Sequence, residues 1–166
     1  MNSLLEERGF TLTEVLIALT LTGLLLTVLA QTGQVAFTRW SRLEQEIEVQ
    51  QHLNIALERM ARELRQAKRL LGTSPTELSF QKVDGTSVRY YLRTGSGNLL
   101  RAESGGKPPV AGYVKRVQLA YYNAEGSPTS DPEQGTSVEI TLTGGAPGIP
   151  DQTVQTKVQI RARSCL

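Results

Sequence analysis

Cysteine and histidine are almost missing from this chain of 166 residues, which contains only Cys165 and His52. A lone cysteine excludes an internal disulfide framework, and one residue of each type excludes the common His/Cys zinc sites. Neither sign of charge dominates, since 18 basic residues stand against 16 acidic ones, so net charge does not drive binding to nucleic acid or to a membrane surface. The length allows one domain of ordinary size.

Familiar catalytic motifs are also absent. The sequence has no P-loop, no G-x-S-x-G, no H-E-x-x-H and no glycine-rich dinucleotide turn. His52 and Cys165 lie far apart in the chain, which argues against a Cys–His catalytic pair. The sequence therefore predicts a protein that is not an enzyme, with no cofactor and no resident metal.

What the sequence does contain is a long apolar segment near its start. Residues 10–30 carry one charged side chain, Glu14, and residues 15–38 carry none. About twenty such residues in a helix cross about 30 Å of hydrocarbon. A cleaved secretory signal fits poorly, because the first eight residues (MNSLLEER) are not basic and no small-x-small site follows. A permanent anchor is the favoured interpretation, with the rest of the chain outside the hydrocarbon.

Glu14 is the unusual residue of this segment. A carboxylate inside an apolar helix costs a few kcal/mol and indicates a function that involves a partner. Cleavage between Gly9 and Phe10 would create an α-amine about one helical turn away. We predict that this amine, from the same chain or a neighbouring one, is the counter-charge of Glu14.

Residues 9–19 (GFTLTEVLIAL) closely resemble the class III signal of type IV pilins and type II secretion pseudopilins. The resemblance implies cleavage after Gly9 by a prepilin peptidase, N-methylation of Phe10, and a role for Glu14 in setting subunit register. It also implies partners: other pilins or pseudopilins, and the inner-membrane assembly platform. The expected location is the inner membrane, with a single spanning helix and an extracytoplasmic C-terminal domain, and then a periplasmic or surface filament.

The chain beyond the apolar segment predicts an α+β fold. Residues 39–71 lack glycine and proline and repeat apolar residues at helical spacing from Trp40 to Leu71, with Gly72 as the stop signal. From there on, apolar and polar residues alternate in six segments, which predicts an antiparallel sheet of five or six strands covered by the stripe from Trp40 to Leu71. The expected divisions are a leader (1–9), a transmembrane or filament-core helix (10–38), an amphipathic helix (39–72) and a sheet domain (73–166).

The expected function is that of a minor pilin or pseudopilin. The strand order, with residues 117–123 (VQLAYYN) and 137–142 (SVEITL), resembles the J-type minor pseudopilin of type II secretion. The paired cysteines of many major pilins are absent. Asp131 and Glu133 lie in a loop that could hold Ca²⁺, although two carboxylates alone do not fill its coordination shell. Cys165 is either a bridge to another subunit or a plain terminal thiol.

Two alternatives remain open at this point. A basic strip on the sheet would suit a DNA-uptake pilin, or an acidic partner subunit. A membrane-anchored exported binding module would share only the apolar N-terminus. The residues of the predicted basic strip are Arg89, Arg93, Arg116, Lys157, Arg161 and Arg163.

Overall fold

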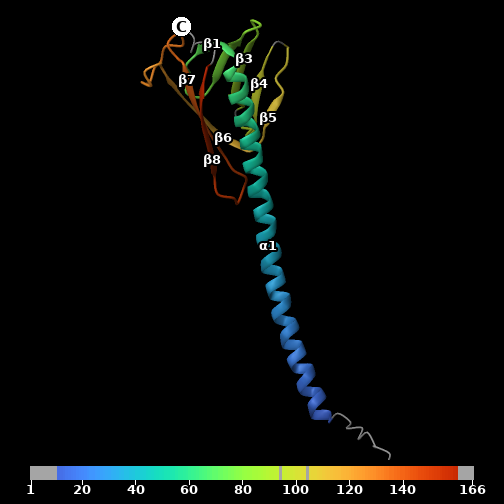
Figure 1. Ribbon diagram of the computed structural model, residues 1–166. Helices are drawn as coiled ribbons and strands as arrows, with labels where there is room; N and C mark the ends of the chain where they lie inside the picture. The colour runs from blue at the N-terminus through green and yellow to red at the C-terminus, as the bar shows by residue number, and fades with distance from the viewer. Residues whose placement is uncertain (1–10, 94, 104, 161–166) are drawn as a thin grey trace, which may run out of the picture. The chain divides into compact units, whose positions relative to one another are not determined.

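The chain divides into two compact units, Met1–Leu43 and Glu44–Leu166. The computed structural model describes residues 11–93, 95–103 and 105–160. One helix, α1 (Leu12–Arg65), passes through both units, and the strands all belong to the second (Figure 1). The predicted α+β class, with a long apolar helix followed by antiparallel sheet, is confirmed.

Within its described residues, the second unit holds eight strands in two antiparallel sheets, where the sequence predicted five or six in one sheet. The five-stranded sheet has the order β1-β2-β3-β4-β5, and the three-stranded sheet the order β6-β7-β8. The pairing breaks after β5, at Tyr113, which has a left-handed φ of 62°. The strand bounds are Ala67–Gly72, Leu78–Lys82, Ser87–Leu92, Leu99–Ala102, Pro109–Ala111, Val114–Tyr122, Ser137–Gly144 and Gln152–Gln159, for β1 to β8 in that order.

The end of the helix differs from the prediction. Helix α1 ends at Arg65, and the residues expected to form its last turn make strand β1, which pairs with β2. Ala67 and Leu70 are both buried in this extended conformation. Packing on the core therefore overrides the helical pattern and the stop signal at Gly72.

The face of α1 that covers the sheets begins later than the sequence suggested. Trp40, Leu43 and Ile47 are 69%, 56% and 49% exposed, whereas Val49 and Leu53 are buried. An α-helix turns by about 100° per residue, so Ile47 points about 120° away from Leu53 around the helix axis. The early apolar residues therefore lie outside the face of α1 that packs on the sheets. The helical residues of the core are Val49, Leu53, Ala56, Leu57, Met60, Ala61 and Leu64.

The sheets supply the other side of the same core, with Phe80, Tyr90, Leu142 and Ile160 among its fully buried side chains. The predicted alternation is confirmed in β2, β3 and β7. In β6 it is shifted by an irregularity between Val114 and Arg116, which buries Val114 and leaves Lys115 exposed. A turn at Asp84-Gly85, a residue pair typical of hairpins, joins β2 and β3, and the Thr86 amide donates to the Asp84 carboxylate there at 2.8 Å.

Gly144 lets strand β7 approach the helix closely. A Cβ atom at this position would lie 2.4 Å from the Tyr113 carbonyl oxygen and 2.9 Å from a Leu53 methyl carbon. We expect Gly144→Ala to lower the free energy of unfolding by about 1–3 kcal/mol, because backbone and core must both shift. Denaturant unfolding of the full chain in detergent measures this effect.

Gly72→Ala is the matched control, because nothing lies within 4 Å of a Cβ at Gly72 and its φ is not left-handed. Equal stability of the two variants would contradict the close packing of β7 on α1.

Candidate assembly site

The N-terminal end of α1 is built by a short capping motif. Thr11 precedes the helix, and its hydroxyl oxygen accepts the Glu14 amide at 3.3 Å. The Thr11 hydroxyl also donates to the Glu14 carboxylate at 3.4 Å. This T-x-x-E arrangement is a capping box in its spacing, and it places a negative side chain at the positive end of the helix dipole. Glu14 therefore has a local reason to lie in the first turn.

The apolar part of α1 is uncovered. Every described side chain from Leu12 to Phe37 is exposed, with Leu12 at 83% and Leu24 at 66%. The helix is long and apolar enough to cross a membrane, and none of its most apolar window is buried. An uncovered leucine-rich surface of this kind requires lipid or other helices around it.

The hydroxyl groups of this segment are satisfied within the helix itself. Thr20, Thr22, Thr27 and Thr32 each donate to a carbonyl oxygen three or four residues earlier, at 2.7–3.0 Å. Such bonds remove the cost of placing a hydroxyl in an apolar medium. Glu14 is the charged residue of this segment, and within the described residues its carboxylate accepts the Thr11 hydroxyl but forms no ion pair.

Gly9 and Phe10, the predicted cleavage and methylation site, lie outside the described residues. The predicted pairing of Glu14 with a Phe10 amine therefore stays a prediction. Cys165 also lies outside the described part of the chain.

The residues of the predicted basic strip belong to different sheets. Arg89 lies on β3, 3.9 Å from the Glu77 carboxylate and above the Tyr91 ring, and Arg93 follows β3. Arg116 lies on β6, while Lys157 on β8 sits 4.0 Å above the Tyr122 ring. Arg161 and Arg163 fall outside the described residues, so the strip as a whole stays a prediction.

The acidic loop folds on itself. The Asp131 carboxylate accepts the Glu133 amide at 2.8 Å, and the Asp131 carbonyl accepts two further amides. No group of three or more His, Cys, Asp or Glu side chains suited to a metal occurs among the described residues. His52 lies edge-on to the Tyr113 ring, with 5.5 Å between ring centroids, and so belongs to the packing of helix and sheet.

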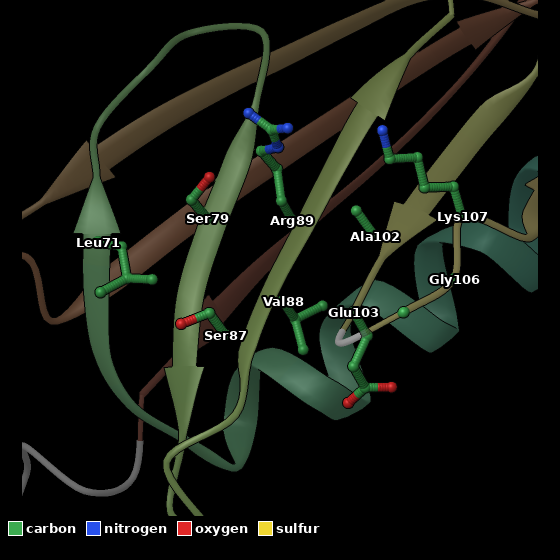
Figure 2. Close-up of a pocket in the computed structure, with 10 residues that line it drawn as sticks. Leu71, Ser79, Ser87, Val88, Arg89, Ala102, Glu103, Gly106 and Lys107 are labelled. Carbon is green, nitrogen blue, oxygen red and sulfur yellow. The ribbon is translucent and has the colours of Figure 1, made fainter.

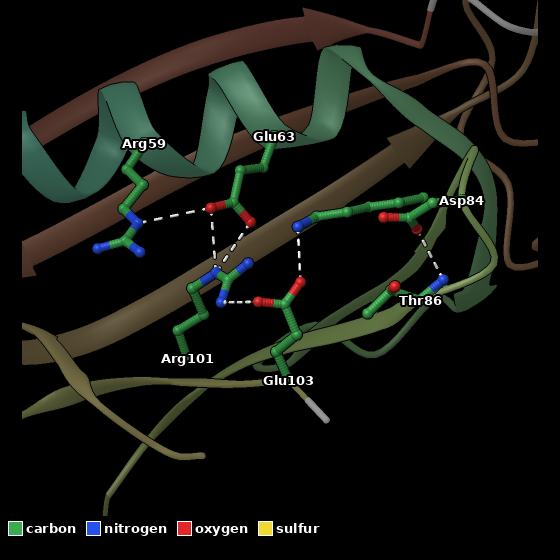
Figure 3. A network of polar contacts seen from close by, with 7 residues as sticks. Arg59, Glu63, Asp84, Thr86, Arg101 and Glu103 are labelled. Atoms are coloured by element: carbon green, nitrogen blue, oxygen red, sulfur yellow. Dashed lines mark hydrogen bonds and ion pairs between the residues drawn. The ribbon is translucent and has the colours of Figure 1, made fainter. Parts of the chain in front are cut away.

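A buried ion-pair network joins α1 to the five-stranded sheet, and the sequence reading missed it (Figure 3). The side chain of Arg101 on β4 is 8% exposed, and its Nε lies 3.0 Å from both carboxylate oxygens of Glu63. Its Nη1 contacts Glu103 at 2.6 Å, and Lys82 contacts the other oxygen of Glu103 at 2.6 Å. Because the Arg101 side chain is nearly buried, removing its partner Glu63 would leave the guanidinium charge poorly solvated and would destabilise the fold.

Tyr90 lies beside this network. Burial, reinforced by the negative charge of Glu63, raises the pKa of the Tyr90 hydroxyl. That hydroxyl is buried without a hydrogen-bond partner among the described residues. Its neutral form is therefore kept at all ordinary pH values.

A hollow with a volume of about 760 Å³ lies on the outer face of the five-stranded sheet. Small side chains form its floor, and Arg89 and Lys107 lie near one end while Glu103 lies near the other (Figure 2). Arg89 is within reach of Glu77, and Glu103 is bound by Lys82 and Arg101. The hollow brings together no acid–base pair among the described residues that line it.

Comparison with known proteins identifies the N-terminal segment. Residues 5–30 match the family model of the prokaryotic N-terminal methylation motif. No curated protein matches the chain. The matched segment includes Gly9, Phe10 and Glu14 and extends into the uncovered apolar part of α1.

The pairing of Glu103 makes stability depend on pH. Hydrogen bonds from Arg101 and then Lys82 lower the pKa of Glu103 from 4.5 to about 2. Because the folded pKa is depressed, the stabilisation is fully present above pH 4.5 and is lost as the pH falls toward 2. We expect denaturant unfolding to show a loss of stability in this window that Glu103→Gln greatly reduces.

Glu125→Gln is the matched control, since Glu125 is exposed in a loop. The interpretation fails if Glu103→Gln and Glu125→Gln have the same pH profile as the unmodified chain.

Proposed function

We propose that this chain, which carries the N-terminal methylation motif of type IV pilins and pseudopilins on a pilin-like helix and sheet, is a minor filament subunit. The filament is the pseudopilus of type II secretion or a type IV pilus. Proteins of this kind are structural and not enzymatic. The observation that carries the proposal is the motif at residues 5–30, followed directly by an uncovered apolar helix.

The uncovered helix supports two successive environments for the subunit. Before assembly, the exposed apolar residues from Leu12 onward lie in the inner membrane, because the segment has the required length and its hydroxyls are already bonded. In the filament, helices of neighbouring subunits replace the lipid. The second unit then lies outside the cytoplasm, as the prepilin-type signal implies.

Glu14 has the role of an assembly residue in this proposal. Prepilin peptidase cuts after Gly9 and exposes the Phe10 amine, which is then methylated. An ammonium group and a carboxylate attract each other strongly where water is excluded. Because Thr11 fixes Glu14 in the first helical turn, the carboxylate is held near the level of the new N-terminus of a neighbouring subunit. A displaced subunit leaves both charges unpaired, so the pair sets the register.

Within this class, we propose that the chain is a minor pseudopilin of the J type. The segments that carry the resemblance, residues 117–123 and 137–142, fall on the antiparallel pair β6 and β7. This pair contributes the core residues Leu119, Tyr121 and Ile140. The partners are then other pseudopilins, the prepilin peptidase and the inner-membrane assembly platform.

Processing can be tested at Gly9. A bulky replacement such as Gly9→Leu should block cleavage, because the peptidase must accommodate the backbone at this bond. We expect intact-mass spectrometry of the membrane fraction to show a chain that retains its first nine residues. Ser3→Leu is the control within the leader, and it should leave cleavage unchanged. Normal cleavage of Gly9→Leu would refute the assigned site.

Assembly can be tested at Glu14. Glu14→Ala and the isosteric Glu14→Gln should insert into the membrane and be cleaved, yet enter filaments at least tenfold less, because the Phe10 ammonium loses its partner. Quantitative immunoblotting of sheared filaments and membranes measures the ratio. Glu44→Gln, in the exposed part of α1, is the control for charge loss. Incorporation of Glu14→Ala at the unmodified level would remove the register role.

A further inference from the structure

We propose that the outer edge of strand β8 is a docking site for an extended, acidic segment of another polypeptide, which adds to the three-stranded sheet as a fourth strand. The site consists of this edge and of the groove between β8 and α1. It lies wholly within the second unit and belongs to none of the residues discussed for processing or register.

The β8 edge differs from the other sheet edges. Strand β1 has two register irregularities, and β5 is three residues long and begins with Pro109. The outer edge of β6 is partly occupied, because the Val114 and Leu119 amides donate to carbonyl oxygens of Gly97 and Pro75 at 2.9 Å. By contrast, β8 is eight residues long, pairs with β7 without a shift and contains no proline. Proteins usually interrupt or cover a free strand edge of this length. The regular edge of β8 is therefore a candidate for pairing with another chain.

The backbone of β8 presents a regular row of hydrogen-bonding groups. The Ile160 amide donates to the Thr136 carbonyl at 2.9 Å, toward β7. Because backbone groups alternate along a strand, the even-numbered residues of β8 face β7 and the odd-numbered ones face outward. No described residue bonds to these outward groups. The outward residues are Thr153, Gln155, Lys157 and Gln159.

A groove of about 580 Å³ runs beside this edge. Thr156 forms one side, and the helix residues Leu57 and Ala61, which are 8% and 4% exposed, provide apolar surface. A strand paired with β8 would direct alternate side chains toward this surface. Main-chain hydrogen bonds then supply affinity and the groove selects side chains, as in other cases of strand addition.

The charged side chains that line the groove indicate which kind of strand would bind there. Arg62 and Arg65 line it together with a single carboxylate, Glu58. All three are exposed, and none forms an ion pair within the described part of the chain. Two guanidinium groups against one carboxylate favour an incoming strand with acidic side chains beside its apolar ones.

A second copy of this chain fits the site less well. Strand β8 has no acidic residue, and its charged side chain, Lys157, lies over the Tyr122 ring on the sheet face opposite to Thr156 and the groove. A second β8 edge would therefore bring no carboxylate to Arg62 and Arg65. The expected occupant is therefore a different polypeptide.

The test uses the full chain in detergent micelles and a labelled synthetic peptide as the probe. The peptide alternates valine with threonine, with the valines on the side that faces the groove, and two of these valines are replaced by glutamate. A second peptide carries lysine at these two positions. Fluorescence anisotropy gives the affinities, with empty micelles as the blank, and residue-resolved hydrogen exchange reports which amides the peptide protects.

We expect the glutamate peptide to bind roughly tenfold more tightly than the lysine peptide, and to slow exchange at the four outward amides of β8. The double variant Arg62→Glu/Arg65→Glu should reverse the preference. Arg93→Glu/Arg116→Glu makes the same charge change outside the groove and should leave the preference intact. Gln155→Pro removes an outward amide and should weaken binding, whereas Gln155→Ala should not.

The proposal is overturned if neither peptide binds, if binding leaves the outward amides unprotected, or if the groove variants keep the original preference. Protection of these amides without peptide, rising with protein concentration, would identify a second copy as the occupant and would also overturn it. None of these measurements depends on cleavage at Gly9, so the outcome is independent of the proposed assembly function.

Discussion

The structure depends on one constraint: the apolar surface of α1 before the second unit has to leave water. Burying a single leucine side chain contributes about 1.5–3 kcal/mol, and this segment exposes many of them. Nothing in the described chain covers them, so the cover has to come from lipid or from other helices. The same medium makes the Glu14 carboxylate costly unless a positive group meets it. In the proposed function, cleavage before Phe10 within the methylation motif would create such a group.

The second half of the helix packs on the protein's own sheets. Its covered face begins at Val49, and Leu53, Met60 and Leu64 pack on the two sheets. Polar contacts then fix how the helix lies on the five-stranded sheet. Arg101 and Glu63 satisfy each other in a nearly buried place, where either alone would be strongly unfavourable. One helix thus presents apolar residues all round in its first part, to a medium outside the molecule, and along one face in its second part, to its own domain.

Local features of the fold could be predicted from the sequence, whereas features that depend on tertiary packing could not. The uncharged segment after Glu14 and the turn at Asp84 are local signals, and both were predictable. Trp40 and Ile47 were assigned to the covered face because spacing alone does not tell which apolar line meets the sheet. The conversion of residues 67–72 into β1 depends on pairing with β2, which is a tertiary effect.

The candidate sites also differ in how far the sequence alone reveals them. Glu14 stands out in the sequence because a charge in an apolar helix is rare, and its assembly role stays a prediction. The ion-pair network was not predictable, because Glu63 and Arg101 are separated along the chain and only the fold brings them together. The same holds for the groove beside β8, since no sequence pattern shows that Leu57 and Ala61 lie next to Thr156. A free strand edge is a property of sheet order and can be recognised only once the order is known.

The most direct test of the central claim is the N-terminus of the unmodified chain, isolated from cells with and without an active prepilin peptidase and measured by intact-mass and fragment-ion spectrometry. The account predicts a chain that begins with methylated Phe10 when the peptidase is active and with Met1 when it is not. A chain that begins with Met1 in both strains would leave Glu14 without its ammonium partner and would contradict the account.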